Sequence, residues 1–184
     1  MPRLIASYRE VEDSEPFGIY LDATGEGGLA SISFFPQNYS ALPVLLKRSS
    51  SEKLNVLAAS TNPIYIFGLF TMAASVFQLR EQLTGKRAIL FVDNEAACAA
   101  LTTGTSKVPG ALLLVYALWA IAAEHDIALW TERVPTGVNP AGLPSRNKEL
   151  SFSTQPSVEL ASLSDLLAAY DFSPVLLQSK KGSI

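Results

Sequence analysis

Short apolar runs bounded by glycine, proline and polar turn residues predict five β-strands in this chain. Two of them, Phe17–Asp22 and Arg87–Asp93, are nearly continuous apolar runs that each end on a carboxylate, as is typical of strands buried in a parallel sheet. Between them, Leu29–Phe35 follows a glycine-rich turn and alternates well enough for an antiparallel strand. The remaining two strands are predicted at Leu42–Lys47 and Ile127–Val134.

Longer apolar stretches between the strands predict helices. The first begins at Asn62 and Pro63, because asparagine can cap a helix and proline suits its first turn, and it should end at Thr84–Gly85. Segment 48–61 fits either a short strand or an irregular crossover, and Pro135–Arg146 is expected to be a loop. Three further helices are predicted at Asn94–Leu101, Pro109–Glu124 and Val158–Tyr170.

The order of these elements predicts the α/β class, with a five-stranded mixed sheet flanked by helices, strand order 3-2-1-4-5 and strand 2 antiparallel. Strands one, four and five would then be parallel at the centre. Asp22 and Asp93 would lie at the carboxyl ends of adjacent strands, where open α/β sheets collect ligand and catalytic groups. Both residues could instead merely end strands or cap turns, as aspartate often does.

Composition favours one soluble domain with a core of its own. The chain has 184 residues, of which 48% are hydrophobic and 17% charged, and this excludes a disordered or highly charged protein. The net charge of −3 and the pI near 5.2 leave no global positive field, so nucleic acid would have to bind at a local basic patch. The single cysteine, Cys98, excludes a disulfide framework and a cysteine-rich zinc module, and it fits an intracellular location, cytoplasmic or nuclear.

The most apolar stretch, Ile64–Leu79, is 16 residues long, which is shorter than the roughly 20 residues that a membrane-spanning helix needs. We therefore expect it to be a buried core helix, and we expect no membrane partner. The residues after Met1 contain too short an apolar run for a secretory signal.

Three sequence motifs follow one another along the predicted strands and turns. They are Tyr20–Gly28 (YLDATGEGG), Phe91–Ala97 (FVDNEAA) and Val134–Arg146 (VPTGVNPAGLPSR). In this order they resemble the motifs of ribonuclease H-like domains, and most closely those of retroelement reverse transcriptases. The resemblance covers Phe17–Arg146, which is 130 of the 184 residues. It implies three regions: a lead-in at 1–16, the ribonuclease H-like domain at 17–146, and a C-terminal extension with one helix at 147–184.

The resemblance implies metal-dependent hydrolysis of RNA in RNA–DNA hybrids, with four carboxylates that hold two Mg²⁺ or Mn²⁺ ions. Asp22 and Asp93 match two of the carboxylate positions and would be the catalytic and metal-binding residues. Glycine stands at the other two positions, Gly68 and Gly142, which should both face the two aspartates. We therefore expect a degenerate site with weakened or lost hydrolysis, and an inactive domain would need no cofactor.

Two alternatives remain open from the sequence. Glu132, which matches an acidic residue common before the last motif, or Glu26 in the glycine-rich turn would complete a rearranged metal site in an active enzyme. A non-catalytic module would instead bind nucleic acid, for which Asn94 and Arg146 are candidates, or a protein such as a neighbouring reverse transcriptase or polyprotein domain. The expected nucleic-acid partner is an RNA–DNA hybrid.

Overall fold

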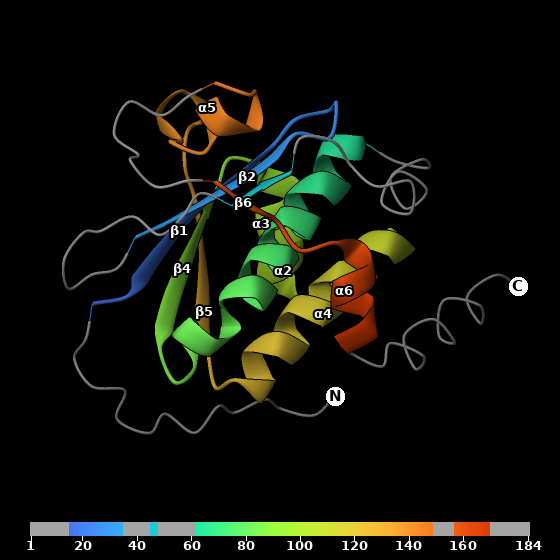
Figure 1. Cartoon of the computed structure of the whole chain (residues 1–184). Helices are drawn as coiled ribbons and strands as arrows, with labels where there is room; N and C mark the ends of the chain where they lie inside the picture. The colour runs from blue at the N-terminus through green and yellow to red at the C-terminus, as the bar shows by residue number, and fades with distance from the viewer. Residues whose placement is uncertain (1–14, 35–44, 48–61, 149–156, 170–184) are drawn as a thin grey trace, which may run out of the picture.

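Strand pairing in the computed structural model joins the described residues into a six-stranded mixed sheet, with most of the helices on one side of it (Figure 1). The structure describes residues 15–34, 45–47, 62–148 and 157–169. The strands lie in the order β5-β4-β1-β2-β3-β6. Their bounds are β1 (Phe17–Ala23), β2 (Leu29–Phe34), β3 (Leu45–Lys47), β4 (Arg87–Val92), β5 (Ala128–Arg133) and β6 (Val158–Glu159).

Strand β1 lies inside the sheet, parallel to β4 on one side and antiparallel to β2 on the other. Beyond them, β5 is parallel to β4, β3 is antiparallel to β2, and β6 is parallel to β3. The prediction of five strands is one short, because Val158 and Glu159 pair with β3 where we expected a helix. Residues 42–44 of the predicted third strand, Phe35 and the uncertain segment 48–61 lie outside the described residues.

Helices cover one face of the sheet. In Figure 1, α2, α3, α4 and α6 lie on the same side, and α2 packs directly against β1, β2 and β4. Their bounds are α2 (Pro63–Leu83), α3 (Glu95–Thr103), α4 (Pro109–Glu124) and α6 (Leu163–Ala169).

The segment after β5 is helical in part, although we predicted a loop over 135–146. It contains a 3-10 turn, η1 (Thr136–Val138), and a short helix, α5 (Gly142–Ser145). Backbone bonds hold both: Val138 N donates to Pro135 O at 3.0 Å, and Ser145 N donates to Ala141 O at 3.2 Å. These turns are too short to leave a helical period among the glycines and prolines of the sequence.

Helix α6 begins five residues later than the helix that we predicted over 158–170, and residue 170 lies outside the described residues. It begins at Leu163 because Ser162 and Asp165 cap each other: Asp165 Oδ2 accepts a bond from Ser162 N at 2.8 Å, and Ser162 Oγ accepts one from Asp165 N at 3.2 Å. Leu163 and Leu166 belong to the main core, and α6 packs on α2. This part of the predicted C-terminal extension therefore contributes to the core.

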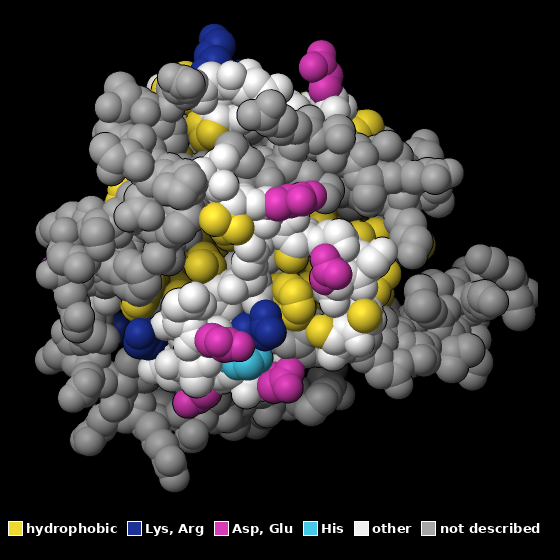
Figure 2. Space-filling model, viewed as in Figure 1, with side chains coloured by type: hydrophobic (Ala, Val, Ile, Leu, Met, Phe, Trp, Pro, Cys, Tyr) yellow, Lys and Arg dark blue, Asp and Glu magenta, His cyan; other side chains and the backbone are white. Residues whose placement is uncertain are grey.

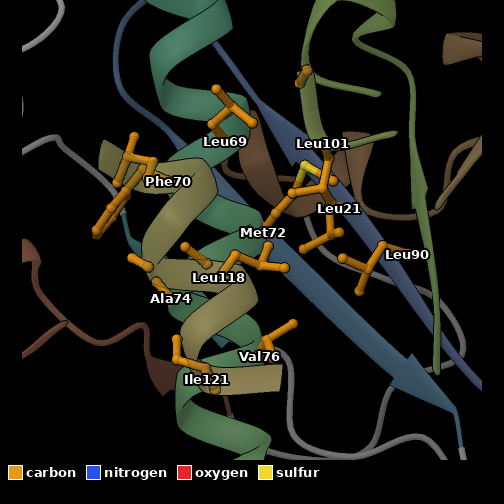
Figure 3. Packing of buried hydrophobic residues seen from close by; sticks show 14 of the residues in the cluster. Leu21, Leu69, Phe70, Met72, Ala74, Val76, Leu90, Leu101, Leu118 and Ile121 are labelled. Carbon is orange, nitrogen blue, oxygen red and sulfur yellow. The ribbon is translucent and has the colours of Figure 1, made fainter. Parts of the chain in front are cut away.

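Helix α2 is the centre of the core. Asn62 caps it by accepting a bond from Ile64 N at 3.2 Å, and Pro63 stands in its first turn. Residues 66–76 are all buried, so the helix is surrounded on every side. Figure 3 shows side chains of α2 meeting those of α4, α3 and the strands; the labelled residues are Leu21, Leu69, Phe70, Met72, Ala74, Val76, Leu90, Leu101, Leu118 and Ile121.

Among the described residues, α2 is also the one helix long and apolar enough to cross a membrane by length and composition. However, 67% of its most apolar window is buried inside the fold. The sheet and the other helices supply that burial, as the interpretation of this stretch as a core helix requires.

The turn between β1 and β2 packs closely against the segment after β5. Within the turn, Thr24 N donates to Gly28 O at 2.8 Å, and Gly28 N donates to Thr24 Oγ1 at 2.9 Å. A Cβ atom on Gly28 would lie 2.1 Å from the carbonyl oxygen of Ser145. Only glycine therefore allows the two backbones to approach this closely.

We predict that Gly28→Ala lowers the free energy of unfolding by about 1–3 kcal/mol, because the added methyl group must push the Ser145 backbone away. Gly25→Ala in the same turn is the control, since its Cβ would meet only the Ile64 side chain, at 3.6 Å. Urea unfolding of both variants measures the difference. Equal losses in the two variants would contradict the close contact.

Candidate functional site

Two carboxylates lie side by side at the carboxyl ends of neighbouring parallel strands. Leu21 of β1 pairs with Val92 of β4, so the next residue of each strand, Asp22 and Asp93, reaches the same edge of the sheet. Both aspartates and Gly68 line a small cavity of about 10 Å³. That volume is of the order that one water-sized group needs. Asn94 lines the same cavity, so the fold brings together four of the predicted site residues.

Asp22 is almost completely withdrawn from water, with 2% of its surface exposed. Burial raises the pKa of Asp22, because desolvation disfavours the charged carboxylate, and the adjacent Asp93 carboxylate raises it further. A hydrogen bond from Ser145 and the charge of Arg146 lower the pKa without cancelling the effect of burial. A desolvated carboxylate beside a second one is characteristic of functional sites.

The partners of Asp22 come from the segment after β5. Asn139 anchors this segment, since its Nδ2 donates to the carbonyl oxygen of Leu21 at 2.8 Å in a buried position. Ser145 Oγ then donates to Asp22 Oδ2, and Arg146 Nη2 lies 3.8 Å from that same oxygen. One carboxylate oxygen therefore has both a hydroxyl donor and a cation beside it.

Gly68 lies in the second turn of α2 and faces the cavity. A Cβ atom there would lie 3.6 Å from Asn94 Nδ2 and 3.7 Å from the Cβ of Ala97, which are ordinary van der Waals distances. The surroundings therefore leave room for a side chain. Packing does not require glycine at this position.

Gly142 faces Arg146, and it is not among the residues that line the cavity. A Cβ atom on Gly142 would lie 2.8 Å from Arg146 Nη1, and the same nitrogen donates to the Gly142 carbonyl oxygen at 2.7 Å. The guanidinium therefore fills the space that a side chain of residue 142 would need. We expected Gly142 to face the aspartates directly, whereas Arg146 lies between it and Asp22.

The other predicted site residues have different surroundings. Asn94 lines the cavity and also caps α3, because its Oδ1 accepts a bond from Ala97 N at 3.0 Å. Glu132 is exposed on β5, and its Oε1 accepts a bond from Trp130 Nε1 at 2.8 Å. Glu26 is exposed in the turn between β1 and β2. Neither glutamate lines the cavity.

Ser145 is a site residue that sequence reasoning missed. We named Arg146 only as a contact for nucleic acid, whereas its guanidinium lies beside Asp22. The available signal was a Ser-Arg pair at the end of the last motif. A pair of polar residues does not reveal a partner that lies 123 positions away along the chain.

The donor set does not fit two metal ions. In the part of the chain that the structure describes, no three His, Cys, Asp or Glu side chains form a group that could hold an ion. A two-metal centre and the octahedral geometry of magnesium need more oxygen ligands than Asp22 and Asp93 supply. In addition, one oxygen of Asp22 already has Ser145 and Arg146 as partners.

No protein-family model matches the chain, and no curated protein matches its sequence. Among solved structures, the chain is similar to the N-terminal RNase H domain of Rv2228c from Mycobacterium tuberculosis, determined as a fusion with maltose-binding protein. The identity is 16% and the TM-score is 0.48, and the match covers 69% of this chain and 92% of that one.

We predict that Gly68→Ala raises the free energy of unfolding by about 0.5–1 kcal/mol, because glycine destabilises a helix interior relative to alanine and the added methyl fits. Gly85→Ala is the matched control: its φ of +70° strains any residue with a Cβ, so this variant should be less stable than wild type. Chemical unfolding gives both values. A loss of stability at Gly68 would show that the cavity does not accept a side chain.

A second prediction concerns pH. Because the pKa of Asp22 is higher in the fold than its ordinary value of 3.8, ionisation of Asp22 destabilises the fold as pH rises from that value through the folded-state pKa. Asp22→Asn removes this penalty, so the variant should have a higher Tm than wild type at neutral pH.

The Tm difference between Asp22→Asn and wild type should shrink as pH falls below the folded-state pKa, where Asp22 is protonated in both states. Thermal unfolding across the range from about pH 3.5 to 8 measures this trend. Asp126→Asn, at an exposed position, is the control. A constant difference between Asp22→Asn and wild type at every pH would contradict the prediction.

Proposed function

We propose that this chain is a ribonuclease H-like domain of the retroelement reverse transcriptase type that has lost metal-dependent hydrolysis of RNA–DNA hybrids. One observation carries the proposal. Asp22 and Asp93 lie together at the ends of parallel strands, and Gly68, where the resemblance implies a further carboxylate, lines the same cavity.

Convergence of the three motifs supports the family assignment. The first motif supplies Asp22, the second supplies Asp93, and the third supplies Ser145 and Arg146. All of them meet at the carboxyl end of β1, in a sheet where β4 and β5 run parallel to β1 and β2 runs antiparallel. Motifs that served separate purposes would have no reason to share one carboxylate.

The chemistry of the site supports the loss of hydrolysis. Two-metal catalysis needs a ligand set that clamps both the attacking and the leaving oxygen of the phosphodiester. Asp22 and Asp93 are too few for this purpose. The rearranged site that we considered from sequence has no support in the geometry, since Glu132 bonds to Trp130 and Glu26 lies in the exposed turn.

Binding without cleavage is the role that remains for such a domain. The chain has a net charge of −3. On the face seen in Figure 2, the described Lys and Arg side chains lie singly and do not gather into a basic patch. Contact with an RNA–DNA hybrid would therefore be weak and salt-sensitive, at the edge of the sheet that carries Asn94 and Arg146.

The proposal predicts that the chain does not cleave an RNA–DNA hybrid above the rate of the metal ion alone, in either Mg²⁺ or Mn²⁺. Gel analysis of an end-labelled hybrid measures cleavage, and Asp93→Asn is the matched control for contaminating nuclease. Cleavage by the wild type that disappears in Asp93→Asn would overturn the proposed loss of activity.

A further inference from the structure

The geometry points to the Arg146 guanidinium as a tethered cation that occupies the cation position at Asp22 and keeps divalent metal ions from it, with Gly142 making the room. This inference rests on the proposed function, because it explains what fills a former metal centre. Gly142 would then have two effects: it removes a metal ligand, and it leaves the space for the cation that replaces the metal.

Arg146 is held in place from two directions. Its Nη2 lies 3.8 Å from Asp22 Oδ2, and its Nη1 donates to the carbonyl oxygen of Gly142 at 2.7 Å. The donated bond fixes the guanidinium against its own turn, so its position does not depend on the ion pair alone. Ser145 Oγ donates to the same oxygen of Asp22 and also lies 3.1 Å from the Gly142 carbonyl oxygen.

Gly142 and Arg146 form a dependent pair. A Cβ atom on residue 142 would lie 2.8 Å from Arg146 Nη1, which is closer than such atoms approach in proteins. Any other L-residue at 142 must therefore displace the guanidinium, and a carboxylate there cannot coexist with Arg146 in this position. Glycine at position 142 leaves free the space in which Arg146 Nη1 lies.

Charge explains why a metal ion and the guanidinium compete. Asp22 has 2% of its surface exposed, so its charge needs a counter-ion at short range. Arg146 supplies this counter-ion, and its side chain is 45% exposed to solvent. A divalent ion at Asp22 would have to displace this cation or be repelled by it.

The test is calorimetric titration of Mn²⁺ alone into the wild type, Arg146→Gln and Lys148→Gln. Lys148 is an exposed cation two positions away, so its substitution makes the same change in net charge without touching Asp22. We expect Arg146→Gln to bind Mn²⁺ at least tenfold more tightly than the wild type, and Lys148→Gln to match the wild type. Asp22→Asn added to Arg146→Gln should abolish the gained binding.

Gly142→Ala is a second variant, which displaces the guanidinium without altering any charge. It should gain Mn²⁺ binding in the same direction as Arg146→Gln, and Mn²⁺ should raise the Tm of both variants more than that of the wild type. The inference would be overturned if wild type and both variants bound Mn²⁺ equally, or if none of them bound it.

The Mn²⁺ titration is independent of the nuclease assay because it contains no nucleic acid. Cleavage of the hybrid by wild type would refute the proposed function whatever the titration shows. Equal Mn²⁺ affinity in wild type and Arg146→Gln, without any cleavage, would refute the tethered cation and leave the proposed function standing.

Discussion

A carboxylate withdrawn from water is tolerated only where hydrogen bonds and an opposite charge surround it, and the carboxyl end of β1 is organised around that requirement. Strand β1 carries Asp22 into the interior, and the segment after β5 returns to bring Ser145 and Arg146 against it. Asn139 fixes that segment to the backbone of Leu21. The close contact between this segment and the β1–β2 turn follows from the same requirement that a hydrogen-bond donor and a cation surround Asp22.

Three glycines near the site differ in what they do for the fold. Gly28 permits a backbone contact that no other residue would allow, and Gly142 leaves the space that Arg146 fills. Gly68 has neither function, because a Cβ atom would fit there at ordinary distances. Gly28 and Gly142 thus adjoin Ser145 and Arg146, the partners of Asp22, whereas Gly68 lines the cavity with both aspartates. At Gly142 a neighbouring side chain fills the space beside the glycine, whereas at Gly68 that space would accept a Cβ atom.

The Asp22–Asp93 pair was predictable because it depends on local pattern: two apolar runs that each end on aspartate, joined by a crossover that makes parallel neighbours. The environment of Asp22 was not, since Ser145 lies 123 positions away and α5 is too short to show a period. Strand β6 was missed for a related reason. Two residues show no alternation, and the pairing partner in β3 determines their conformation.

Helix α2 packs against strands β1, β2 and β4 and helices α3, α4 and α6, whereas α5 packs mainly against β1, β2 and β3 among the described elements. We therefore expect α2 and α5 to unfold locally with different free energies. Accordingly, we expect amide protons of α2 to exchange with solvent more slowly than those of the turn that carries Arg146. A substitution in that turn is therefore expected to change the surroundings of Asp22 more than the packing around α2.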